Sequence, residues 1–188
     1  MTVVALVLAA GQGSRFGADK RRATLPDGRS LLAHSVERVL AVFDEVRVVL
    51  REGERAEDFG LPAGCQVIHS PDAALGMGHS LAAGAVSLSD SDAQAVAILL
   101  GDMPWIAPQT LRALSEAASA SSILFPIFEG QRGHPVLFGR EFWPALTQLT
   151  GDEGARTVVQ ANRDRCVTLE VADAGVLRDV DTPNALRS

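Results

Sequence analysis

Cysteine is scarce in this sequence, which has only two among 188 residues, Cys65 and Cys166. They lie far apart, have no paired spacing and are accompanied by only four histidines, so neither a disulfide framework nor a zinc site is indicated. Long apolar runs are also missing, because none approaches the roughly 18 residues that cross a bilayer. The apolar run 3–10 is too short and lacks the basic leader of a signal peptide. We expect no membrane partner and a reducing, cytoplasmic location.

Positive charge is limited too. The net charge is -6 and the pI is near 5.2, so the overall field repels nucleic acid and anionic membranes, and an anionic ligand needs a local basic pocket. Lys20 is the only lysine among 17 lysine and arginine residues. A lysine presents a compact ammonium group that arginine does not replace at a tight phosphate contact. This singles out Lys20, although a lone lysine must fall somewhere by chance.

Short apolar runs alternate with amphipathic stretches, and no repeat or linker divides residues 1–188. This predicts one α/β domain, a three-layer α/β/α sandwich with a Rossmann-like, mostly parallel sheet. Ligands bind such sheets at the carboxyl ends of the strands. The predicted strands are 3–8, 46–50, 65–68, 95–100, 123–125, 167–171 and 176–177; the predicted helices are 31–40, 80–88, one beginning at 108, 141–149 and 154–161, with a β excursion over 126–138.

A glycine-rich loop follows the first predicted strand. Gly11, Gly13 and Gly17 are spaced G-x-G-x-x-x-G, one residue longer than the dinucleotide fingerprint, and no Walker A pattern can be read from the loop. Glycines allow backbone N–H groups to approach phosphate, and Arg15 and Lys20 add positive charge. A plain flexible turn is the alternative, but the combination with both cations favours a phosphate-binding loop.

The pattern L-A-A-G-x-G-x-R-x-G-x-x-K resembles the signature of the molybdenum cofactor cytidylyltransferases and guanylyltransferases, and its Ala-Ala-Gly form is closer to the cytidylyl branch. The resemblance implies a fold of the nucleotide-diphospho-sugar transferase type and catalytic roles for Arg15 and Lys20. One departure is Arg21-Arg22, where family members commonly have apolar residues, and the sequence does not say whether these arginines enter the pocket. The resemblance implies that the nucleotide-binding residues are Leu8, Ala9, Ala10, Gly11, Gly13, Ser14, Arg15 and Lys20.

Acidic residues follow two of the predicted strands. Asp102 lies in Gly-Asp-Met-Pro directly after strand 95–100, and Asp179 and Asp181 lie in Asp-Val-Asp-Thr-Pro. Carboxylates at such positions suit Mg²⁺, which takes one or two protein carboxylates together with substrate phosphates. A turn at Asp102 and a helix cap at Asp181 are the structural alternatives. The family resemblance implies Asp102, which is also catalytic, and Asp181 as the metal ligands, with Asp179 competing for the second place.

Three further segments resemble the cytidylyl branch. The segment 75–81, Leu-Gly-Met-Gly-His-Ser-Leu, lies near the base in that branch, which implies nucleotide binding by Ser80; an ordinary N-cap serine is the alternative. Gly-His-Pro-Val at 133–136 and Gly-Asp-Glu-Gly-Ala-Arg at 151–156 resemble acceptor-side segments. Arg156 suits an acceptor phosphate or a structural ion pair with Asp152. The implied acceptor-binding residues are His134, Pro135, Asp152 and Arg156.

The expected reaction is in-line attack by an acceptor phosphate on the α-phosphorus, with release of pyrophosphate. The resemblance implies CTP as donor, molybdopterin as acceptor, Mg²⁺ as cofactor and a molybdoenzyme as recipient of the product from a monomeric enzyme. GTP, another small acceptor, and a non-catalytic nucleotide-binding chaperone remain alternatives. Ser80, Asp102 and His134 also follow the order of a hydrolase triad, but the segment around Ser80 is not a nucleophile elbow.

Overall fold

The first strand shows why the sheet forms around it. The structure is a computed structural model that describes residues 2–11, 18–181 and 186. Strand β1 (Val3–Leu8) is buried along its whole length, and it pairs in parallel with β2 (Glu45–Arg51) and β4 (Ala95–Leu100). A strand covered on both faces can be apolar at every position, which explains the unbroken run Val-Val-Ala-Leu-Val-Leu.

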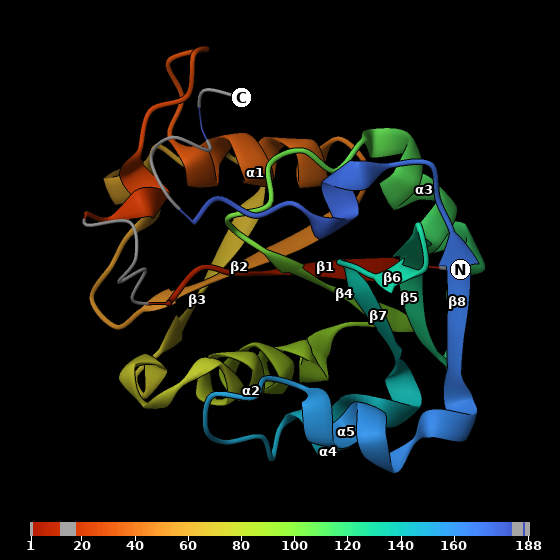
Figure 1. Cartoon of the computed structure of the whole chain (residues 1–188). Coiled ribbons are helices and arrows are strands. Elements are labelled where there is room, and N and C mark those ends of the chain that lie inside the picture. Colours follow the sequence, from red (N-terminus) through yellow and green to blue (C-terminus); the bar gives the residue numbers. More distant parts are fainter. Residues whose placement is uncertain (1, 12–17, 182–185, 187–188) are drawn as a thin grey trace.

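The eight strands form one mixed sheet in the order β3-β2-β1-β4-β7-β5-β6, with β8 paired to β5 (Figure 1). Strands β1 to β4 are mutually parallel, and β8 is parallel to β5. Strand β7 is antiparallel to both β4 and β5, so the predicted β excursion contributes an internal strand of the sheet. The remaining bounds are β3 (Cys65–Ser70), β5 (Ile123–Phe128), β6 (Gln131–Arg132), β7 (Val136–Gly139) and β8 (Cys166–Glu170).

Helices cover both faces of the sheet, which confirms the predicted three layers (Figure 1). Helices α1 (Leu31–Leu40) and α3 (Pro108–Ala117) lie on one face. Helices α2 (Met77–Ser87), α4 (Trp143–Leu146) and α5 (Arg156–Ala161) lie on the other. The Ser30 side chain accepts a hydrogen bond from the Ala33 N–H and caps α1, an interaction worth about 1 kcal/mol.

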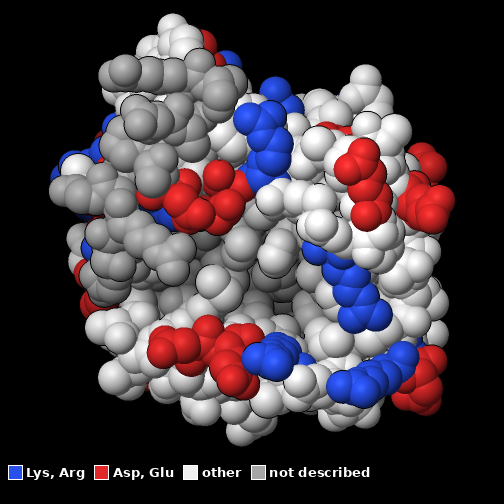
Figure 2. Space-filling model, viewed as in Figure 1, with Lys and Arg blue, Asp and Glu red and all other residues white. Residues whose placement is uncertain are grey.

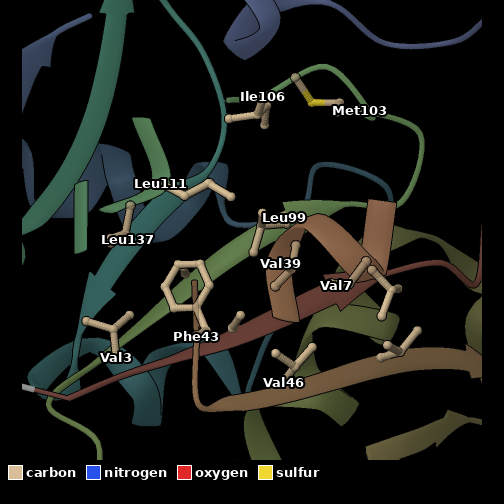
Figure 3. Close-up of a cluster of buried hydrophobic side chains, with 14 of the residues drawn as sticks. Val3, Val7, Val39, Phe43, Val46, Leu99, Met103, Ile106, Leu111 and Leu137 are labelled. Carbon is tan, nitrogen blue, oxygen red and sulfur yellow. The ribbon is translucent and has the colours of Figure 1, made fainter. Parts of the chain in front are cut away.

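Two apolar clusters fill the spaces between the layers. Alternate residues of β1 contribute to opposite clusters, Val3 and Val7 to one and Val4 and Leu6 to the other. Figure 3 shows the first cluster, in which side chains from β1, β2 and β4 meet those of α1 and α3. Because successive side chains of a strand point to opposite faces, one apolar strand serves both cores.

The structure corrects one predicted strand and trims two helices. Residues 176–177 belong to a 3-10 helix, Ala174–Leu177, in which the Asp173 side chain accepts from the Gly175 N–H. An added Cβ at Gly175 would clash with the Trp105 carbonyl group, so the close approach of this backbone requires glycine. The helix expected over 141–149 is a 3-10 turn followed by α4, and the last helix begins at residue 156. No helix among the described residues is long and apolar enough to cross a membrane.

Candidate functional site

A cleft lies where β1 and β4 end side by side. The residue after each strand is still hydrogen-bonded to a neighbouring strand. The Ala9 N–H donates to the Val49 carbonyl oxygen at 3.0 Å, and the Gly101 N–H donates to the Leu8 carbonyl oxygen at 3.0 Å. The cleft therefore has a fixed floor at the edge where parallel sheets bind ligands. Figure 2 shows a hollow on this face with separate basic and acidic side chains around it. The lining includes Leu8, Ala9, Ala10, Gly11, Lys20, Ser80, Asp102 and Asp152.

Lys20 and Asp102 form an ion pair in this cleft, although 82 positions separate them. The Lys20 Nζ donates to the Asp102 Oδ2 at 2.8 Å and to the Val180 carbonyl oxygen at 3.1 Å. The Val180 N–H in turn donates to the Asp102 carbonyl at 2.8 Å. Both charged side chains are about one fifth exposed, at 19% and 20%, so a ligand can reach them. The structure thus joins three segments that the sequence analysis selected separately.

Asp179 and Asp181 are exposed, and Asp179 lines a smaller hollow that also contains His134 and Leu100. Partial burial raises the pKa of Asp179, and the negative charges of Asp102 and Asp181 raise it further. Such mutual repulsion is relieved by a bound cation. No cluster of three or more metal-binding side chains with suitable geometry is found among the described residues. Mg²⁺ needs only one or two protein carboxylates when substrate phosphates supply other ligands, so Asp102 with Asp179 or Asp181 stays a predicted set of ligands.

Within the glycine-rich loop, the structure describes the residues up to Gly11 and those from Ala18 onward. Gly13, Ser14 and Arg15, which the sequence analysis selected, lie outside the described residues, as does the predicted helix start after Asp181. Residues 8–11 line the cleft, and their role in nucleotide binding stays a prediction.

Arg21 is buried, whereas Arg22 has an exposed side chain, so only the second of the departing arginines faces solvent. The Arg21 guanidinium makes a two-pronged contact with the Glu54 carboxylate, with both N–O distances at 2.7 Å. It also bonds the Asp19 carboxylate and the Ala9 carbonyl. The ring of Phe59 lies 4.5 Å from this guanidinium. Arg21 therefore ties the glycine-rich loop to the turn after β2.

Arg51 and Glu54 are two residues that sequence reasoning missed. The Arg51 side chain, at the end of β2, donates to the carbonyls of Ala10 and Gly11, and the Arg51 backbone N–H donates to Glu54 Oε1 at 2.8 Å. The one available signal was position, because Arg51 ends a parallel strand beside β1. Their partners are distant in the sequence, which no local pattern indicates.

The network containing Glu54 and Asp19 predicts loss of stability in acid. Burial raises the pKa of both carboxyl groups, but hydrogen bonds and charge from Arg21 outweigh this and hold both pKa values below the ordinary 4.5 and 3.8. The stabilisation is therefore complete above about pH 4.5 and is lost as pH falls through the lower folded values. Urea unfolding of the wild type and of Glu54→Gln between pH 6 and pH 3 checks this. The wild type should lose more stability over that range, and equal losses would contradict the prediction.

Helix α2 begins against the loop before α5. The Gly78 N–H donates to the Gly151 carbonyl at 2.8 Å, and an added Cβ at Gly78 would lie 2.5 Å from the Thr150 carbonyl oxygen. The close approach at Gly78 is thus to the backbone of the loop before α5. Ser80 is buried inside the helix, whose N-cap is Gly76, so it is not an N-cap serine, and it lines the cleft.

A second cavity of about 680 Å³ adjoins the cleft at Leu8, Met77 and Leu100. Its walls are mainly apolar, and three arginines with exposed side chains join them. Arg132 lies over the ring of Phe125, with 4.4 Å to the ring centre. This combination accommodates an apolar body that carries anionic groups. The apolar lining includes Leu81, Ile98, Phe125, Val136 and Phe138, and the arginines are Arg132, Arg156 and Arg163.

The predicted acceptor residues are distributed over both hollows. His134 and Arg156 line the second cavity, Asp152 lines the first cleft, and Pro135 is buried and lines neither. Burial lowers the pKa of His134, with only partial opposition from Asp102, so its imidazole is neutral near pH 7. Arg156 pairs at 4.0 Å with Glu153 instead of Asp152, and both side chains are mostly exposed.

The hydrolase arrangement has no support from this geometry. Ser80 lies within α2 and not on a strand-to-helix turn, and no hydrogen bond within the described ranges joins it to His134. The Asp102 carboxylate is instead paired with Lys20.

The fold and the cleft define the class as nucleotidyltransferases of the nucleotide-diphospho-sugar transferase fold. The profile of the family described as "MobA-like NTP transferase domain" matches residues 5–166, and the chain belongs to this family. The family implies a nucleoside triphosphate substrate.

Three known proteins illustrate the relationship. The chain is 31% identical to the purine catabolism protein PucB of Bacillus subtilis over 96% of this chain and 92% of that protein. It is 30% identical to the bifunctional protein GlmU of Cereibacter sphaeroides over 94% of this chain, but it spans only 39% of that longer protein. The crystal structure of Rv0371C from Mycobacterium tuberculosis in complex with manganese has a TM-score of 0.81 and 27% identity, covering 100% of this chain and 97% of that one.

Proposed function

We propose that this protein transfers CMP from CTP to molybdopterin, with Mg²⁺ and release of pyrophosphate, as a cytoplasmic monomer that supplies a molybdoenzyme. One observation carries the proposal. Lys20, Asp102 and the start of the glycine-rich loop lie in a single cleft, and this cleft opens into a second cavity large enough for an acceptor. The donor base and the acceptor come from the motif resemblance, whereas the two adjoining hollows support a reaction between two substrates.

One group of residues binds the phosphates of the nucleotide, and the carboxylates hold the metal ion. Lys20 and the backbone N–H groups of the loop hold the β- and γ-phosphates as they leave, because pyrophosphate departure increases negative charge there. Asp102, with Asp179 or Asp181, would hold Mg²⁺. When bound, that ion neutralises charge on the reacting phosphates. The side chains of the two hollows hold acceptor and donor in line, so the transfer needs no protein nucleophile.

The second cavity supports an acceptor of the molybdopterin type. A planar ring system suits the apolar walls, and its phosphate can be met by arginines at the same cavity. The neutral His134 can donate or accept one hydrogen bond there, which suits the polar edge of a heterocycle.

Pyrophosphate release should depend on CTP when purified protein receives Mg²⁺ and molybdopterin. Parallel reactions with GTP and with each component omitted provide the controls. Release from GTP alone would place the protein in the guanylyl branch. Tight binding of a nucleotide with no release from either would favour another acceptor or the non-catalytic chaperone and would overturn the proposed reaction.

A further inference from the structure

Three consecutive carbonyl groups at the start of the glycine-rich loop bind guanidinium groups. The Ala9 carbonyl accepts from Arg21 Nη1 at 2.8 Å, and the Ala10 carbonyl accepts from Arg51 Nε at 3.1 Å. The Gly11 carbonyl accepts from Arg51 Nη2. Both arginines lie outside residues 9–11, because Arg21 follows the loop and Arg51 ends β2. They therefore restrain the peptide planes of these residues from outside.

The orientation of these planes decides where the N–H groups point. In a trans peptide the carbonyl and the N–H lie on opposite sides of the chain, so fixing the carbonyls of Ala9 and Ala10 also fixes the N–H groups of Ala10 and Gly11. Residues 9–11 line the cleft. Successive backbone N–H groups in a concave turn bind phosphate oxygens. The guanidinium groups therefore restrain the orientation of the peptide planes that line the cleft.

Glu54 connects the two arginines. Its carboxylate accepts hydrogen bonds from Nη1 and Nη2 of Arg21 and from the backbone N–H of Arg51. The Glu54 side chain is only 17% exposed. Asp19 binds the other edge of Arg21. Two arginines and two carboxylates carry no formal net charge together. The cluster thus acts on the loop through orientation and not by adding positive charge to the cleft.

We propose that Glu54 is a positioning residue for triphosphate binding: it fixes Arg21 and Arg51, which brace the loop carbonyls so that the N–H groups face the nucleotide phosphates. The inference rests on the proposed function and assigns to this chain a brace of Arg21, Arg51 and Glu54, of which Arg21 departs from the family pattern. It explains why Arg21 is buried and why an arginine ends β2.

Glu54→Gln and Arg51→Met should each raise the KM for the nucleoside triphosphate about 10-fold, while kcat changes less than about threefold because Lys20 and Asp102 are untouched. Glu57→Gln is the matched control, since the Glu57 side chain is 77% exposed and lies three residues away. Direct titration with nucleoside triphosphate and nucleoside monophosphate separates the brace from general structural damage. The variants should weaken triphosphate binding and leave monophosphate binding within about twofold of wild type.

Circular dichroism and thermal unfolding establish that each variant is folded at the assay temperature. Arg51→Met leaves the Arg21–Glu54 pair intact. If Glu54→Gln unfolds, nucleotide binding by Arg51→Met therefore decides the result. Unchanged triphosphate affinity in folded Arg51→Met, or equal weakening for both nucleotides, would overturn the brace. Wild-type protein that binds no nucleoside triphosphate would instead overturn the proposed function.

Discussion

Replacing Asp102 by asparagine should lower kcat for pyrophosphate release by about 100-fold or more, a loss typical of removing one fixed group that stabilises transition-state charge. Asparagine keeps the size of the side chain and an oxygen that can accept from Lys20, so the ion pair becomes a hydrogen bond from the charged ammonium to a neutral amide oxygen, with little disturbance of the loop. The variant lacks the carboxylate that would hold Mg²⁺. Steady-state assays with saturating nucleotide and acceptor measure the effect.

Asp92→Asn is the matched control for this change. Asp92 is exposed and lies before β4, at the opposite end of the strand from Asp102, so its replacement should leave kcat within about twofold of wild type. Binding of CTP without metal should be no weaker in Asp102→Asn, because the change removes a negative charge beside the phosphate site. Full activity in a folded Asp102→Asn protein would remove Asp102 from the catalytic machinery.

The elements next to the cleft could be predicted well from sequence. Strands 3–8 and 95–100 have the predicted bounds, and helix 31–40 matches the apolar periodicity. Each segment has a strong apolar pattern, because the strands are covered on both faces and the helix is covered along one face. Because both strands are parallel and adjacent, their following loops had to meet, and Lys20 and Asp102 do meet.

The errors have local physical causes. The pair Val176–Leu177 was predicted as extended because two adjacent apolar residues fit either a strand or a 3-10 turn. The deciding interactions come from the Asp173 side chain and the Trp105 backbone. The β excursion was recognised, but its place between β4 and β5 depends on long-range pairing. The acceptor cavity likewise combines side chains from several distant elements.

The burial of Arg21 is a feature that the sequence alone does not decide. An arginine in a loop is usually exposed, and the sequence does not say whether Arg21 or Arg22 enters the pocket. The partner that permits burial, Glu54, lies 33 positions away. A buried charge is tolerated only when paired and hydrogen-bonded, so the position of Glu54 determines where Arg21 can lie.

Arg21→Met should destabilise the protein by about 3–5 kcal/mol, because it leaves the carboxylates of Glu54 and Asp19 partly buried without their cation. For a protein of this size the melting temperature should fall by about 10 °C. Arg22→Met is the matched control, since its side chain is 55% exposed and its distance to Asp19 is 3.6 Å. That change should cost about 0.5 kcal/mol or less.

Urea unfolding at pH 7 measures both variants, and the double variant Arg21→Met with Glu54→Gln tests the cause. If the unpaired carboxylate is responsible, neutralising Glu54 should recover part of the loss, so the two changes together cost less than their sum. Equal destabilisation by Arg21→Met and Arg22→Met would contradict the burial argument. Strict additivity in the double variant would place the loss in the packing of Arg21 against Phe59, whose ring centre lies 4.5 Å from the guanidinium, and not in its ion pair.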